Sequence, residues 1–296
     1  AYPAQVVPVA VKSLNYNSTE VMWKTVEGAS GYKIYHKKAT DKSYKLLGTA
    51  LGKNNVRYID SNTECGVDYC YTIKAFRTQG ESDYYGPNSR VIKGKSIPSA
   101  PVVKVSNLSY DSLNISWNKV NGADGYRIYY KNSNDTKWSR LTTFDNGDLT
   151  SFFQSSLTTG KKYTYTVRAY HKVDNSKCWG AYDNTGASGT PVTTAPKLTS
   201  LKSINYKTNR INWNSVAGAS GYKIYRKTQN TSWAGIATIH DKSVLSYDDE
   251  TASCGVKYTY TVRAYRKVNN KNIYGKYSET GLSITSVPET PIISLS

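Results

Sequence analysis

Short stretches in which apolar and polar residues alternate recur along the whole chain. In "LNISWNKV", residues 113–120, Leu113, Ile115 and Trp117 share one face, and the residues between them are polar. Successive side chains of a strand point to opposite faces, so this period of two predicts strands with one buried side. Turn-forming segments such as "VNGADG" and "DNGD" separate the stretches, and no stretch has a convincing helical period. The pattern therefore predicts an all-β chain.

The alternating segments occur in three versions. "GYKIYHK" at residue 31, "GYRIYYK" at 125 and "GYKIYRK" at 221 are one strand, and "YTIKAFR" at 71, "YTVRAYH" at 165 and "YTVRAYR" at 260 are another. Trp23, Trp117 and Trp213 precede the first strand, at spacings of 94 and 96 residues. A period near 95 residues fits whole domains in tandem. About seven short strands per repeat predict an antiparallel β-sandwich.

Each repeat resembles a fibronectin type III domain. The matching pattern is a Trp on the second strand, Gly-Tyr-x-Ile-Tyr on the third and Tyr-x-Tyr-x-Val-x-Ala on the sixth. The resemblance covers nearly the whole chain, and "VNGADGYRIYYK" is similar to versions found in secreted and surface proteins of Gram-positive bacteria. It implies three tandem sandwiches in an elongated rod, each with a tyrosine corner where the sixth strand opens. The expected core markers are Trp23, Trp117, Trp213, Tyr69, Tyr163 and Tyr258.

The repeats set the expected domain boundaries. We predict modules at residues 1–97, 98–192 and 193–287. "PETPIIS" at 288 repeats "PSAPVVK" at 98, so residues 288–296 are predicted to be the first strand of a truncated fourth module. We therefore expect a fragment of a longer array.

The four cysteines do not suit metal binding or catalysis. Zinc sites use Cys and His at short paired spacings, and no such pair occurs among Cys65, Cys70, Cys178, Cys254 and the three histidines. A catalytic cysteine needs a base and an oxyanion site, and no such constellation is visible. The acidic segment "YDDE", residues 247–250, is a weak calcium candidate and fits a turn better. We predict no enzyme activity, no metal site and no cofactor.

The implied topology suggests a different use for two thiols. In this fold the turn before the sixth strand lies where the chain leaves a module, and the hairpin after it lies where the chain enters. Cys65 is in that turn of the first module, and Cys178 is in that hairpin of the second. We predict an inter-domain disulfide, Cys65–Cys178, against the alternatives of a Cys65–Cys70 bridge or four free thiols. The matching pair at the second junction is Thr159 and Ile273, and Cys254 would await a partner from a fourth module.

A basic and aromatic face is expected on every module. The outward positions of the paired third and sixth strands carry Lys33, Tyr35, Lys37, Lys74, Arg127, Tyr129, Lys131, Arg168, Tyr170, Lys223, Tyr225, Lys227, Arg263 and Tyr265. One interpretation is that these side chains cover one another on a solvent-facing sheet. The other is a weak site, repeated along the rod, for an anionic polymer. Trp138 and Trp233 lie at matching places beyond the third strand and are expected to pack at the sandwich edge.

The net charge is +18 and is spread over all three repeats. A distributed basic excess favours polyanionic surroundings, or simply protects edge strands. We expect a non-catalytic extracellular spacer that presents other domains of a larger bacterial surface protein. The alternatives are adhesion to a glycan or anionic cell-wall polymer, and an accessory region of a secreted polysaccharide-degrading enzyme. Expected partners are other domains of the same parent chain, and glycans or anionic wall polymers in the adhesion alternative, with no nucleic acid, no membrane insertion and a monomeric state. The expected location is secreted or cell-surface.

Overall fold

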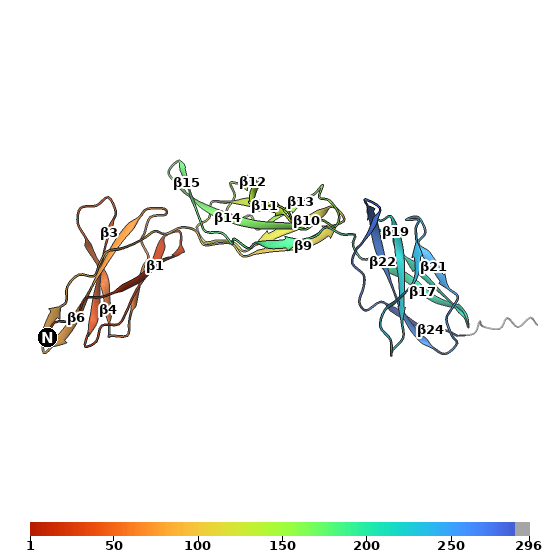
Figure 1. Ribbon diagram of the computed structural model, residues 1–296, viewed down its shortest axis with the longest axis horizontal. Helices are drawn as coiled ribbons and strands as arrows, with labels where there is room; N and C mark the ends of the chain where they lie inside the picture. Colours follow the sequence, from red (N-terminus) through yellow and green to blue (C-terminus); the bar gives the residue numbers. More distant parts are fainter. Residues whose placement is uncertain (288–296) are drawn as a thin grey trace, which may run out of the picture.

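A computed structural model describes residues 1–287, which form 24 strands joined by turns and loops. The strands build three antiparallel β-sandwiches that lie end to end in one row (Figure 1). We refer to them as the first module (β1–β8), the second (β9–β16) and the third (β17–β24). Within this described part, no helix has the length and apolar character needed to cross a membrane.

Each sandwich has a three-stranded sheet facing a larger one. In the first module the small sheet has the order β1-β2-β5 and the large sheet β4-β3-β6-β7, with β8 also paired to β6. The strands are β1 (Pro8–Asn15), β2 (Ser18–Trp23), β3 (Gly31–Lys38), β4 (Lys45–Leu51), β5 (Arg57–Asp60), β6 (Tyr69–Gln79), β7 (Ser82–Tyr85) and β8 (Ile92–Gly94).

The second and third modules repeat this strand order. The second consists of β9 (Val103–Ser109), β10 (Ser112–Trp117), β11 (Gly125–Asn132), β12 (Ser139–Phe144), β13 (Ser151–Gln154), β14 (Tyr163–Val173), β15 (Ser176–Trp179) and β16 (Ala187–Gly189). The third consists of β17 (Leu198–Asn205), β18 (Thr208–Trp213), β19 (Gly221–Lys227), β20 (Ala234–Ile239), β21 (Ser246–Asp249), β22 (Lys257–Val268), β23 (Lys271–Tyr274) and β24 (Leu282–Thr285).

Eight strands per module, rather than about seven, arise because the last strand is broken in two. In the first module β7 pairs with the end of β6 and β8 pairs with its start. Pro87 lies in the gap and has no N–H to donate to a ladder. The chain around it still contacts β6, because the Gly86 and Ser89 amides donate to the carbonyls of Ala75 and Ile73.

Each module has a separate core built from aromatic rings. Trp23, Trp117 and Trp213 are at most 5% exposed, and each contacts a fully buried tyrosine with ring centroids 5.3–5.4 Å apart. Those tyrosines are Tyr32, Tyr126 and Tyr222. Three distinct clusters of buried residues form, one in each sandwich. The burial of these large aromatic side chains thus contributes strongly to the stability of each module.

Buried tyrosine hydroxyls bind the backbone of the loops beside them. Tyr69, Tyr163 and Tyr258 each accept a hydrogen bond from the amide five residues earlier, at 3.3, 3.0 and 3.2 Å. This is the geometry of a tyrosine corner. Tyr32 does the same for the amide of Val26 at 2.9 Å, and it donates to the carbonyl of Lys53. The aromatic residues therefore hold the turns as well as the sheets.

The predicted strand at 288–296 lies outside the described residues.

Candidate functional site

The first junction is crosslinked. Cys65 lies in the turn before β6 and forms an isolated bridge with Ser96, close to where the chain leaves the first module. Cys178 lies on β15, in the hairpin that points back at that module. The two residues form a disulfide with their Cα atoms 6.2 Å apart. This bond spans 113 residues and connects two separately folded sandwiches.

Non-covalent contacts surround the disulfide. Tyr16, in the turn between β1 and β2, packs against Gly122 and against the ring of His171 at 4.6 Å. Gly122 has a φ of 69°, and a Cβ there would lie 2.1 Å from the Tyr16 ring, so only glycine fits. His171 also holds the Gly122 carbonyl, with Nδ1 at 2.8 Å from the oxygen. Tyr16 is thus seated on a glycine and an aromatic ring of the next module.

The second junction has the same plan without the disulfide. Tyr110 takes the place of Tyr16 and packs against Gly218, where a Cβ would again lie 2.1 Å from the ring. Arg266 takes the place of His171, lies 4.4 Å from the Tyr110 ring centroid and donates to the Gly218 carbonyl at 3.0 Å. Ile273 takes the place of Cys178 and packs against Gly160. The two junctions are therefore equivalent interfaces.

The remaining cysteines have different surroundings. Cys70 pairs across the sheet with Lys37 and Lys93, on the outward side of the large sheet, and is nevertheless only 5% exposed. Cys254 occupies the turn of the third module that Cys65 occupies in the first, and it is exposed. Neither thiol is bonded within residues 1–287.

The predicted basic and aromatic face consists of interleaved cations and rings. Lys33 lies 4.7 Å from the Tyr85 ring centroid, Arg127 lies 4.0 Å from that of Trp179, and Lys227 lies 4.6 Å from that of Trp233. Every predicted member except two is partly exposed: Lys33, Tyr35, Lys37, Lys74, Arg127, Tyr129, Lys131, Arg168, Lys223, Tyr225, Lys227 and Arg263. All cations of the face except Lys74 thus already lie over rings of their own module, as mutual covering requires.

The placement of Tyr170 and Tyr265 on an exposed face is wrong. Tyr170 is fully buried, and Tyr265 is 2% exposed. Each ring lies over the glycine opposite it on the neighbouring strand, Gly125 or Gly221, because a residue without a side chain leaves that space open. Trp179 also packs against Tyr170, with ring centroids 5.0 Å apart. The alternation predicted the outward direction of Tyr170 and Tyr265 correctly, but it did not predict that these rings are buried.

The second module has a hollow on this face. It has a volume of about 450 Å³ and is lined by Tyr129, Thr136, Lys137, Trp138, Arg168 and Tyr182. Lys131 lies 4.6 Å from the Trp138 ring centroid, and Arg168 lies 5.7 Å from that of Tyr182. Trp138 is half-buried and leans over the sheet, close to Gly186. The hollow combines ring faces with two cations, which are groups that contact sugars and anions.

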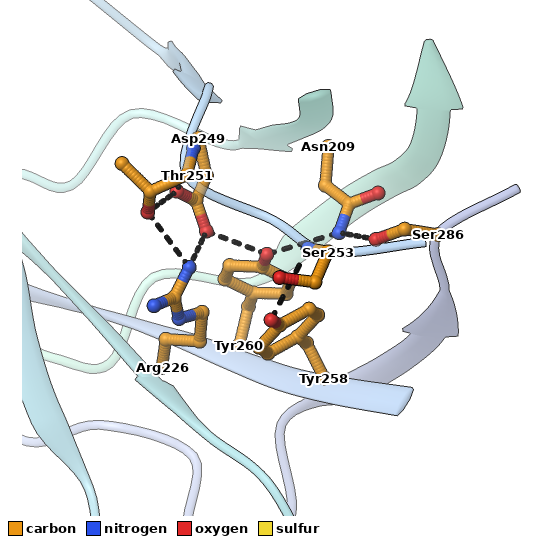
Figure 2. Close-up of polar contacts among 8 residues, drawn as sticks. All are labelled: Asn209, Arg226, Asp249, Thr251, Ser253, Tyr258, Tyr260 and Ser286. Carbon is orange, nitrogen blue, oxygen red and sulfur yellow. Dashed lines mark hydrogen bonds and ion pairs between the residues drawn. The ribbon is translucent and has the colours of Figure 1, made fainter. Parts of the chain in front are cut away.

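A buried charged network occupies the core of the third module (Figure 2). Asp249 is 1% exposed and accepts hydrogen bonds at 2.7 Å from Arg226, Tyr260 and Thr251. Asn209 extends the network by donating to the Tyr260 hydroxyl and to Ser286. Burial alone raises the pKa of Asp249, but these hydrogen bonds together outweigh it and hold the pKa below its ordinary value of 3.8. The network connects four strands, β18, β19, β21 and β22, with Ser286 just after β24.

Sequence reasoning missed this network. The segment "YDDE" was expected to be a turn, whereas Asp248 and Asp249 lie on strand β21 and only Glu250 follows it. Asp248 points the other way and forms two hydrogen bonds with Arg210, at 2.7 and 2.6 Å. The sequence did contain a signal for it. Tyr247 and Asp249 share one face and Asp248 lies on the other, which is a strand pattern with a charged residue on the buried face.

At the equivalent positions, the other two modules carry fewer charged side chains. In the first module His36, Asp60 and Tyr71 replace Arg226, Asp249 and Tyr260, with Asp60 fully buried and 2.7 Å from His36. In the second module the corresponding residues are Tyr130, Gln154 and Tyr165. There the Tyr165 hydroxyl and Gln154 Oε1 have no hydrogen-bond partner in the described chain. Within residues 1–287 no His, Cys, Asp and Glu side chains group as metal ligands would.

Comparison with known proteins agrees with this architecture. Residues 97–178, most of the second module, match the fibronectin type III domain family. The chain is a tandem array of fibronectin type III-like domains. The three domains have the same strand pairing and similar but separate cores, and they differ mainly in the buried polar network and in the junction cysteines.

Two longer proteins are similar to this chain over most of its length. Exoglucanase B of Cellulomonas fimi is 24% identical over 97% of this chain and 26% of its own length. Fibronectin type III domain-containing protein 7 of Mus musculus is 25% identical over 84% of this chain and 31% of its own length. The chain thus spans about a quarter to a third of the length of these relatives. The crystal structure of chicken CNTN1 FN1–FN3 domains is 19% identical, covers 97% of this chain and gives a TM-score of 0.32.

Proposed function

We propose that this array is a non-catalytic spacer that holds other domains of a larger bacterial protein at a set distance. The observation that carries the proposal is the repeated junction. Tyr16 and Tyr110 pack against equivalent glycines of the following module, and the Cys65–Cys178 disulfide crosslinks the first of these two contacts. A chain whose modules only needed to be tethered would not need matched contacts at both linkers.

The larger protein is, in this proposal, a secreted polysaccharide-degrading enzyme. The similarity to an exoglucanase extends over nearly the whole chain, which supports this choice over a purely structural surface protein. The disulfide supports a location outside the reducing cytoplasm, either secreted or on the cell surface. The chain acts as a monomer, and its partners are the other domains of its own polypeptide.

Small-angle X-ray scattering tests the spacer role. The oxidised chain is expected to give a narrow distribution of maximum dimensions, consistent with three sandwiches in a row. The double variant Cys65→Ser, Cys178→Ser is expected to broaden that distribution without changing the circular dichroism spectrum. A distribution that is equally broad with and without the disulfide, and that extends to folded-back conformers, would contradict a spacer.

A second candidate function is adhesion to a glycan or an anionic cell-wall polymer. The hollow on the second module favours it, because Trp138 and Tyr129 offer ring faces beside Arg168 and Lys137. A cation and a ring recognise anionic sugars jointly, and repetition along the array would add avidity.

Retention on an immobilised anionic polysaccharide measures this directly. We expect elution at moderate salt, and earlier elution of the Trp138→Ala variant than of a Phe153→Ala control, whose exposed ring lies on the small sheet of the same module. If both variants elute with the unchanged chain, only net charge is acting and the hollow is not a site. On a column of double-stranded DNA, where net charge alone governs retention, the two variants are expected to elute together.

A further inference from the structure

The C-terminal end of the third module repeats the surface that both earlier junctions cover. We name this surface the distal pole and define it by Tyr206, Cys254 and Gly255. Its scaffold is the same at all three positions. The amides of Gly66, Gly160 and Gly255 donate to the carbonyls of Ser96, Pro191 and Ser286 at 2.8, 2.9 and 2.8 Å. Ser13 and Ser203 bind the carbonyls of Ile97 and Val287 in the same way.

The contact groups of this scaffold are covered at the junctions and open at the distal pole. Tyr16 and Tyr110 are half-buried against glycines of the following module, whereas Tyr206 is 51% exposed. A Cβ built on Gly66 or Gly160 would lie 3.1 Å from the hairpin of the following module. A Cβ built on Gly255 would meet no described atom within 4 Å. Cys254 is likewise exposed.

The two covered junctions define what fits such a surface. Each partner offers a positive-φ glycine for the tyrosine, Gly122 or Gly218, and a flat side chain above it, His171 or Arg266. Each also offers a hairpin residue opposite the turn. That residue is Cys178 where the turn carries a cysteine, and Ile273 where the turn carries Thr159. At the first junction a cysteine faces a cysteine, and at the second junction both positions lack cysteine.

We propose that the distal pole docks a further sandwich of the same kind, following in the same polypeptide, and that Cys254 forms a disulfide with a cysteine at that sandwich's Cys178 position. This goes beyond the spacer role, because it specifies a partner and a covalent bond whatever the array presents. The two thiols lose two electrons and two protons, which a small disulfide such as oxidised glutathione accepts as it is reduced to two thiols.

A fusion of the chain with its own second module tests the proposal. Residues 1–287 are followed directly by a second copy of residues 98–192. This joins "SV" to "PSAPVV" where the first junction has "SIPSAPVV". The fusion is refolded with oxidised glutathione, alkylated and mapped without reduction. We expect a peptide that links Cys254 to the appended copy's cysteine, and at least a tenfold lower alkylation of Cys254 than in the unfused chain.

Two outcomes overturn the proposal. One is alkylation of Cys254 at the same rate as in the unfused chain while Cys65–Cys178 remains intact. The other is linkage of Cys254 only between molecules, seen as a dimer on a non-reducing gel, which would make a second copy the partner.

Two further fusions separate docking from folding and from chance oxidation. In the first, the appended copy carries Gly122→Val, which blocks the seat for Tyr206, so alkylation of Cys254 should return to the unfused level. In the second, residues 193–287 with Ile273→Cys replace the appended copy. The Cys254 linkage should form here as well, even if the appended second module folds poorly. Failure of the linkage in both folded fusions would also overturn the proposal.

Discussion

Tyr163 and Tyr165 lie two positions apart on the buried face of β14, and their hydroxyls have opposite circumstances. Tyr163 accepts a hydrogen bond from the amide of Thr158 at 3.0 Å, as in the other two modules. Tyr165 has no partner for its hydroxyl in the described chain, although it is fully buried. The same residue type thus holds a loop at one position and only fills space at the other.

We predict that Tyr163→Phe destabilises the second module by about 1–2 kcal/mol, because an amide loses its partner. Tyr165→Phe should change the stability by less than about 0.5 kcal/mol, because no hydrogen bond is lost. Hydrogen exchange of β14 peptides in the full chain measures both effects. Equal losses in the two variants would contradict this account of the corner. Tyr260→Phe is a third member of the series and should resemble Tyr163→Phe, because the Tyr260 hydroxyl donates to Asp249.

Asp249 makes the stability of the third module depend on pH. Its pKa in the folded state lies below the ordinary value of 3.8. The stabilisation from its charged form is therefore fully present above that value and is lost as pH falls through the lower, folded-state pKa. We predict that Asp249→Asn costs roughly 3 kcal/mol near pH 6, by leaving Arg226 without its partner.

The difference in unfolding free energy between the wild type and Asp249→Asn should shrink as pH falls below 3.8, the ordinary pKa of an aspartate. The wild type then loses the same carboxylate charge that the variant lacks. Exchange rates of β22 amides, corrected for the intrinsic effect of pH, follow this difference from pH 6 to pH 2. A constant difference over that range would show that the carboxylate charge does not contribute.

At the scale of elements, the alternation pattern and the repeated aromatics were sufficient to predict three sandwiches, and the resemblance to fibronectin type III domains added the pairing of the third and sixth strands and the buried tryptophans. The pattern placed Tyr170 outward but could not show that Gly125, on another strand, leaves room for its ring. It could not find the Arg226–Asp249 pair either, since the partners are 23 residues apart on facing sheets. Contacts between elements therefore mark the limit of what the sequence pattern could predict.

The equivalence of the junctions gives a prediction at this scale. The double variant Thr159→Cys, Ile273→Cys should form a disulfide across the second junction, because Gly160 and Ile273 contact one another as Gly66 and Cys178 do. Alkylation under denaturing conditions counts the free thiols, and only Cys70 and Cys254 should react. Reaction of all four unpaired cysteines would show that the second interface differs from the first. Thr159→Cys alone serves as the control and should leave its thiol reactive.

At the scale of the whole molecule, the disulfide couples the unfolding of two modules and leaves the third independent. Closing a loop of 113 residues restricts the unfolded chain by roughly 4–5 kcal/mol in the chain-entropy description. Reduction should therefore speed exchange in β6 and β14 together and leave β22 unchanged. Peptide-resolved hydrogen exchange with and without reductant measures this. An equal effect in β22 would mean that the three sandwiches unfold as one unit.

The Cys65–Cys178 bond also closes a covalent ring that contains the whole peptide connection between the first and second modules. Two routes of covalent bonds therefore run in parallel between these modules, one through the linker and one through sulfur. A protease that cuts any single peptide bond between residues 65 and 178 leaves both pieces attached. At the second junction one cut releases the third module. In a milieu rich in proteases, this array would be expected to shed its C-terminal part first.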